Sequence, residues 1–133
     1  METSTNRVKR RESTKRTMRA LLGAEGVSFL LAAAVHAGIL LSGYEHREAM
    51  LAESVLGTVL LVGLAVTLVR PRSLFAVAAG VQAFALLGTL VGIWTIIVGI
   101  GPRTLPDVVY HAVVVVALVA GLVLAWRNRG AKL

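Results

Sequence analysis

Three titratable residues, His36, Glu53 and His111, lie within separate long apolar stretches of the sequence. An ionisable side chain inside a membrane costs roughly 2.5–3.5 kcal/mol on insertion scales, so each of these residues is a candidate for function. Counted from the ends of the apolar stretches, His36 is expected about 9 Å from one membrane face, and the other two about 6 Å from that same face. We therefore predict that the three side chains converge in one pocket, with Trp94 and Tyr110 in the same outer layer.

Two imidazoles and a carboxylate are compatible with three kinds of site. His36, Glu53 and His111 are ligand types for Zn, Fe, Mn or Cu. The two imidazoles could instead hold a haem, with Arg103 near enough to the membrane surface to meet a propionate. The third possibility is a proton-responsive pocket, which would bind a quinone or another amphipathic ligand beside Trp94. The spacing does not separate a metal ion, a haem and a quinone-like ligand, so the cofactor stays open.

Each of the three residues also has a simpler explanation when it is taken alone. A single His36 could bond a neighbouring backbone carbonyl or reach the headgroup region. Glu53 would be stabilised in the first turn of a helix, where negative charge is favoured. His111 is also expected in a first turn, but a cation gains nothing from the helix dipole there. The shared depth on three different helices is the observation that favours a common pocket.

Glu25 and Gln82 are two further polar residues that we expect within the membrane. Glu25 and His36 are eleven residues apart and fall on nearly one stripe of a helix. Because the helical rise separates them by roughly 16 Å, Glu25 is predicted to form a different polar site, with Gln82 as its partner. Small residues spaced four apart, at positions 34 and 38 and at positions 88 and 92, predict close approaches between helices.

The composition indicates what kind of element carries these residues. The 133 residues are 56% hydrophobic, and the mean hydropathy is +0.78, yet the net charge is +7. A soluble domain of this size could not cover so much apolar surface. Four apolar blocks, at 18–42, 49–69, 73–100 and 107–126, are each long enough for a helix that crosses the hydrocarbon layer. Their short connections predict an all-α, up-down bundle of four transmembrane helices.

The basic residues predict how the bundle is oriented. Segments 1–17 and 127–133 are treated as a basic N-terminal arm and a basic tail that flank the membrane domain, 18–126. Both termini are predicted to be cytoplasmic, because twelve of the fourteen Lys and Arg residues lie outside the loops that follow the first and third blocks. These twelve are Arg7, Lys9, Arg10, Arg11, Lys15, Arg16, Arg19, Arg70, Arg72, Arg127, Arg129 and Lys132. We expect the arm to be solvated, partly disordered and attracted to anionic lipids. Since it has no aromatic residue to stack on bases, no nucleic-acid binding is expected.

Several classes of chemistry have no support in the sequence. The chain has no cysteine, which excludes disulfides, thiolate metal sites and cysteine-based redox exchange. We find no phosphate-binding loop, no dinucleotide fingerprint and no serine-nucleophile elbow. The excess of Arg over Lys, with abundant Ala, Val, Gly and Leu, is typical of GC-rich bacterial genomes. We name no catalytic residue, and a binding role is favoured over an enzyme.

Three segments of the chain carry a family resemblance. They are "AEGVSFLLAAAVH" at 24–36, "LAESVLG" at 51–57 and "GPRTLPDVVYH" at 101–111. In these segments the chain resembles small four-span integral membrane proteins of actinobacteria, loosely the DoxX-like proteins, over about residues 19–126. The resemblance implies the four-helix fold and a location in the bacterial inner membrane. It implies no catalytic residue.

Three classes of function follow from these patterns. The favoured class is a small binding or accessory membrane protein that uses the outer His/Glu pocket, with a homo-oligomer or a larger complex as its candidate assembly. The second is a proton-coupled transporter that acts as a homodimer through Glu25, although an aromatic content of 5% is low for a drug-binding chamber. The third is a membrane oxidoreductase, for which the chain offers no electron carrier of its own.

Overall fold

Four long helices make up the fold. The computed structural model describes residues 1–130, and within that range there is no strand. The helices are α1 (Ser4–His36), α2 (Arg47–Val69), α3 (Leu74–Ile97) and α4 (Leu105–Asn128), and a short 3-10 turn, η1 (Pro71–Ser73), joins α2 to α3. Each long helix is apolar and long enough to cross a membrane. The prediction of four apolar helices is confirmed.

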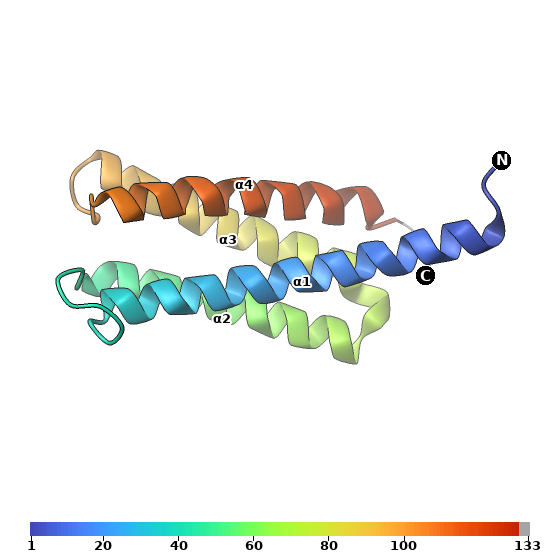
Figure 1. Cartoon of the computed structure of the whole chain (residues 1–133), viewed down its shortest axis with the longest axis horizontal. Helices are drawn as coiled ribbons and strands as arrows, with labels where there is room; N and C mark the ends of the chain where they lie inside the picture. Colours follow the sequence, from blue (N-terminus) through green and yellow to red (C-terminus); the bar gives the residue numbers. More distant parts are fainter. Residues whose placement is uncertain (131–133) are drawn as a thin grey trace.

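The four helices run side by side in alternating directions (Figure 1). The loops at 37–46 and 98–104 lie at one end of the bundle, which we call the loop end. The turn at 70–73 and both ends of the described chain lie toward the other end, the terminal end. Contacts are most extensive between α1 and α2 and least extensive where α1 meets α3 and α4. The seam between α1 and α4 is therefore looser than the seam between α1 and α2.

Small residues allow α1 and α2 to approach each other closely. A Cβ atom added at Gly57 would lie 2.9 Å from the Gly26 carbonyl oxygen, and one added at Gly26 would lie 2.7 Å from Cγ of Leu61. Large apolar side chains fill the interior elsewhere, with Leu22 and Leu60 fully buried. The outer surface is also rich in exposed apolar side chains. An apolar interior together with an apolar exterior is the expected pattern for a bundle surrounded by lipid.

The N-terminal arm differs from the expected disordered segment, because α1 begins at Ser4 and includes it. Thr3 caps this helix, with its hydroxyl accepting from the Asn6 N–H, and Lys15 pairs with Glu12 at 2.7 Å. Lys, Arg and Glu are good helix formers. Since the arm continues a helix that has already nucleated, it avoids the unfavourable first turn. The predicted tail lies partly outside the described residues, because Lys132 belongs to 131–133.

The end of α1 also differs from the prediction, because the helix stops at His36 and not at residue 42. Gly38 follows it with φ +73°, and the amide of Ile39 donates to the carbonyl of Ala34. This is the left-handed glycine that commonly ends a helix. The predicted small-residue pair at positions 34 and 38 is therefore wrong, because Gly38 lies outside the helix. In the same way, α3 ends at Ile97, just before Gly99 with φ +86°.

Candidate functional site

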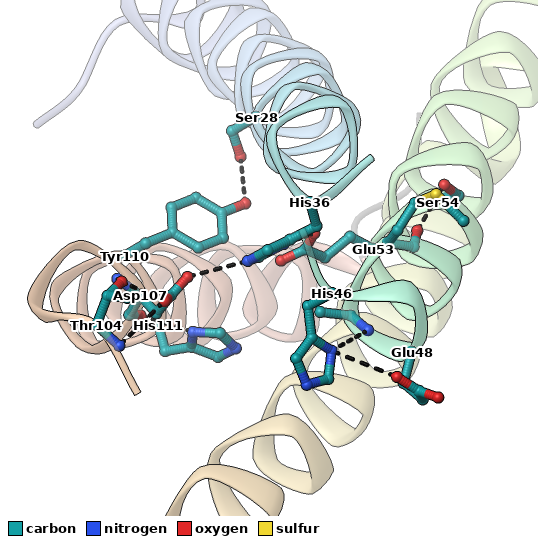
Figure 2. Close-up of polar contacts among 12 residues, drawn as sticks. Ser28, His36, His46, Glu48, Glu53, Ser54, Thr104, Asp107, Tyr110 and His111 are labelled. Atoms are coloured by element: carbon teal, nitrogen blue, oxygen red, sulfur yellow. Dashed lines mark hydrogen bonds and ion pairs between the residues drawn. The ribbon is translucent and has the colours of Figure 1, made fainter. Parts of the chain in front are cut away.

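A buried imidazole lies between two buried carboxylates at the loop end of the bundle (Figure 2). The Nδ1 atom of His36 is 2.7 Å from Oε2 of Glu53, and its Nε2 atom is 3.0 Å from Oδ1 of Asp107. The three residues are only 5%, 5% and 7% exposed, respectively. We call Glu53, His36 and Asp107 the polar chain. It confirms the predicted contact between His36 and Glu53 and adds Asp107 from α4.

Local sequence places each member of the polar chain. His36 is the last residue of α1 because Gly38 terminates that helix. Asp107 lies in the first turn of α4, where it forms a capping box with Thr104. One carboxylate oxygen of Asp107 accepts from the Thr104 N–H at 3.2 Å, and the other faces His36. The side chain that fixes the start of α4 therefore also ties α4 to α1.

The geometry of the polar chain fixes a minimum number of protons. A neutral imidazole has a single N–H, so it cannot donate to two ionised carboxylates at once. Both contacts of His36 are hydrogen bonds only when the three groups together hold two protons. The imidazole carries both protons, or a carboxyl group of Glu53 or Asp107 carries one of them. The polar chain thus holds at least two protons when both contacts are hydrogen bonds, and it joins three helices.

His111 lies next to the polar chain but is not directly bonded to Glu53 or His36. Its Nδ1–H donates to the backbone carbonyl of Asp107 at 2.7 Å, one helical turn earlier. In the neutral ring this bond leaves Nε2 as an acceptor, and no hydrogen bond within residues 1–130 involves that atom. A Cβ added at Gly92 would be 3.3 Å from that atom, so the glycine leaves room for the ring. The predicted trio is therefore a direct pair, with His111 beside it.

A pocket of about 140 Å³ adjoins the polar chain between α2, α3 and α4, and we call it the head pocket. Glu53 and His111 supply polar groups in its lining, and Phe29 and Thr89 are among its other residues. The Oε1 atom of Glu53 is buried and has no hydrogen-bond partner within the described chain. Such an unpaired buried acceptor is unfavourable, typically by about 1–3 kcal/mol. The head pocket thus has mainly apolar walls, and two of its lining side chains, Glu53 and His111, carry nitrogen or oxygen atoms that no hydrogen bond among the described residues uses.

The head pocket continues into an apolar groove between α2 and α3, which we call the α2/α3 groove. The two share four lining residues, Ala52, Leu56, Gly88 and Val91. Gly88 allows α3 to pack closely against α2 at this junction, because an added Cβ would lie 2.6 Å from Cδ2 of Leu56. The predicted close approach at positions 88 and 92 is confirmed. It packs Gly88 against α2 and Gly92 against His111.

A second pocket lies on the other side of the polar chain, between α1 and α4. It measures about 380 Å³, and its lining includes His36, Asp107 and Tyr110. The Tyr110 hydroxyl lies 3.2 Å from the Ser28 hydroxyl, so it already has a hydrogen-bond partner. The rest of the lining is mainly apolar and includes Leu31, Val35 and Leu41. The polar chain therefore separates two pockets and contributes side chains to both.

His46 joins the two loops at this end of the bundle. Its Nδ1 accepts from the Ala49 N–H at 3.2 Å, which caps α2, and its Nε2–H donates to the Ile100 carbonyl at 3.1 Å. The sequence-based prediction did not include this role of His46. It also did not include Asp107 among the residues that contact His36. A signal for Asp107 existed, because Asp107 and His111 are four residues apart on one helix face, after a capping threonine.

Two residues predicted near the pocket lie elsewhere. Arg103 donates from Nε to the Ile96 carbonyl at 2.9 Å and from a terminal nitrogen to the Ile97 carbonyl at 3.1 Å. It therefore caps the C-terminal end of α3, where free carbonyls favour a cation. Trp94 is 62% exposed on the outside of the bundle and lines neither pocket beside the polar chain.

Glu25 and Gln82 form the separate polar contact that was predicted for them. The Gln82 amide donates to Oε2 of Glu25 at 2.5 Å, and both side chains are buried. Oε1 of each residue has no hydrogen-bond partner in the described part of the chain. Gly121 makes room for the amide, because an added Cβ would be 2.5 Å from its nitrogen. Within a single chain, Glu25 thus faces the core and not an outer surface that a second copy could share.

The ligand atoms that remain free decide which cofactors fit. Both ring nitrogens of His36 face carboxylates, so this arrangement offers no pair of histidines for the two sides of a haem. Across residues 1–130, no group of three or more His, Cys, Asp or Glu side chains is arranged to hold a metal ion. Among the described residues, Oε1 of Glu53 and Nε2 of a neutral His111 have no hydrogen-bond partner, and acceptors of this kind suit a ligand that donates hydrogen bonds.

Comparisons with known proteins do not assign the chain to a family. No family model matches it, and neither a curated protein nor a solved structure is significantly similar to it. The polar chain, the head pocket and the α2/α3 groove are therefore the features from which a function can be inferred.

Proposed function

We propose that this chain is a multi-pass protein of the bacterial inner membrane, and that it binds a quinol-like ligand in the head pocket. Four membrane-length helices and the distribution of basic residues support this location, with both termini in the cytoplasm. The loop end, with the polar chain, then lies toward the outer face. The proposal rests on Glu53, which lines this mainly apolar pocket. Its Oε1 atom is buried and has no hydrogen-bond partner among the described residues.

The size of the head pocket suits one aromatic ring. Its volume is about 140 Å³. An engineered apolar cavity of about 150 Å³ accepts a benzene molecule, so one ring is a reasonable occupant. A hydroquinone ring adds two hydroxyl donors to that shape. These donors match the two acceptors, Oε1 of Glu53 and Nε2 of His111, whereas a quinone has only acceptors.

The α2/α3 groove explains why the ligand should be amphipathic. It shares four residues with the head pocket, and the residues that line it also include the exposed side chains Leu51 and Leu87. An apolar tail in this groove would remain in contact with lipid while the ring reaches the acceptors. Ligand sites commonly have apolar walls and a few polar groups that set the orientation.

A pair of matched probes tests the proposal. One probe is a hydroquinone with a decyl chain, and the other is its dimethyl ether, which has a similar shape but no donors. Both would be titrated into the detergent-purified chain by calorimetry. We expect the hydroquinone to bind roughly 10- to 30-fold more tightly, because two hydrogen bonds contribute about 1 kcal/mol each.

Two variants locate the bound probe. His111→Phe keeps a ring of similar size and removes one acceptor, so it should reduce the preference for the hydroquinone. Ala52→Phe narrows the junction between the head pocket and the α2/α3 groove, so it should weaken both probes. Thr58→Phe adds the same ring at an exposed position of α2 outside these pockets and serves as the control. Equal affinity for the two probes, or tight binding to Ala52→Phe, would contradict the proposal.

A further inference from the structure

A third hollow lies between α3 and α4, away from the polar chain and toward the terminal end. Its volume is about 630 Å³. Small residues of α3, among them Ala76, Gly80 and Ala83, form one wall, and Leu122 and Val123 of α4 belong to the other. A Cβ added at Gly80 would meet no atom within 4 Å, so the space beside this glycine is open. We call this hollow the α3/α4 groove.

Positive charge and an aromatic ring lie at the terminal end of the α3/α4 groove. Trp126, Arg127 and Arg129 belong to its lining. The Arg129 guanidinium lies 3.2 Å from the centre of the Trp126 ring, in a cation–π contact. The lining residues, which all fall within 76–129, include no acidic side chain. The groove therefore has an apolar length and a cationic end.

We propose that the α3/α4 groove binds one anionic phospholipid, with an acyl chain along the small residues and the phosphate at Arg127 and Arg129. Arginine suits this role because its planar guanidinium can bind phosphate oxygens through two hydrogen bonds. Trp126 lies where tryptophan is enriched in membrane proteins, at the boundary between hydrocarbon and headgroups. The proposal concerns a different part of the bundle from the head pocket and does not depend on it.

Charge favours a lipid over a second copy of the chain. Small-residue faces can also pack helices together, so a dimer through this groove is the main competitor. A two-fold dimer with its axis along the membrane normal would bring the same end of each copy together. Arg127 and Arg129 would then face the same arginines of the other copy, and like charges repel. An anionic headgroup turns the same two charges into a favourable interaction.

Native mass spectrometry of the full chain from detergent tests this site. The added lipids are phosphatidylglycerol and phosphatidylcholine with identical acyl chains, so that only the headgroup differs. We expect one phosphatidylglycerol to be retained in preference to phosphatidylcholine. Removing both arginines, as Arg127→Gln with Arg129→Gln, should reduce that preference roughly 30-fold, the effect of two basic residues near anionic headgroups.

Two matched controls distinguish lipid binding in this groove from a general attraction of anionic lipids to a basic protein. Arg16→Gln with Arg72→Gln also removes two positive charges, at exposed positions outside the groove, and should retain the preference. Gly80→Leu fills the open space and should weaken both lipids, whereas Ala120→Leu adds the same side chain to an exposed position of α4 and should not. An equal loss in both arginine pairs would overturn the proposal. Unchanged retention of both lipids by Gly80→Leu would also overturn it. So would the observation that the wild-type chain is a dimer and that Gly80→Leu is a monomer.

Discussion

His36 joins three helices near the loop end of the bundle, because it touches Glu53 of α2 through Nδ1 at 2.7 Å and Asp107 of α4 through Nε2 at 3.0 Å. All three side chains are buried, so water does not screen the two carboxylates. A buried ion pair is a weak source of stability by comparison with apolar packing, but loss of one partner is strongly destabilising. The polar chain should therefore be sensitive to the loss of its central imidazole.

Replacement of His36 by alanine should destabilise the bundle by about 3–5 kcal/mol, because it leaves two buried carboxylates without their partner. The measurement is the free energy of unfolding in mixed detergent micelles, followed by circular dichroism. Adding Glu53→Gln and Asp107→Asn to His36→Ala should recover part of this loss, since the neutral side chains no longer leave charge buried. If His36→Ala is as stable as the wild type, the polar chain does not contribute as described.

Gly121 and Gly80 should respond in opposite directions when each is replaced by alanine. The new Cβ at position 121 would lie 2.5 Å from the buried Gln82 amide, which pairs with Glu25, whereas at position 80 it meets nothing. We expect Gly121→Ala to cost about 1–3 kcal/mol, typical of overpacking. Gly80→Ala should gain about 0.5–1 kcal/mol, because alanine favours the helix. The same unfolding measurement decides this, and equal effects at the two sites would contradict the close packing of Gln82.

The helices and two of the polar contacts could be predicted from the sequence because they depend on local patterns. Long apolar blocks in the sequence predict helices of membrane-spanning length, and the four long helices of the structure agree with this prediction. The helical rise placed His36 and Glu53 near one depth and put Glu25 at another, where it meets Gln82. Depth within the membrane does not specify which way a side chain points around its helix. It was sufficient for these two pairs because a buried ionisable group has few possible partners in an apolar bundle.

The rest of the site depended on where the helices end and on how they turn about their axes. Gly38 was counted inside the first helix, which placed His36 too far from the helix end. Asp107 was treated as a marker for the start of the fourth helix, yet its second oxygen bonds His36. The fourth helix is apolar on every side, so its sequence does not reveal which face is buried. For this reason the place of His111, beside the pair and not bonded to it, could not be predicted.

Arg103→Ala should affect stability and leave ligand binding unchanged. Its guanidinium donates to the carbonyls of Ile96 and Ile97 at the end of α3 and does not line the head pocket. Loss of these exposed hydrogen bonds should cost about 1 kcal/mol. Arg47→Ala, which removes an exposed charge from the same end of the bundle, is the control for charge. A large loss of hydroquinone affinity in Arg103→Ala alone would restore the earlier hypothesis that this residue binds a cofactor.

The last prediction concerns orientation. Because the chain has no cysteine, a single introduced thiol reports its own side of the membrane. Ser42 lies in the loop after α1, Ser13 lies in the N-terminal arm, and both are exposed. The excess of basic residues at the terminal end predicts that Ser42→Cys reacts with an impermeant maleimide in intact cells, while Ser13→Cys reacts only after the cells are opened. The opposite result would place the polar chain on the cytoplasmic side, and a ligand would then enter the head pocket from the inner leaflet.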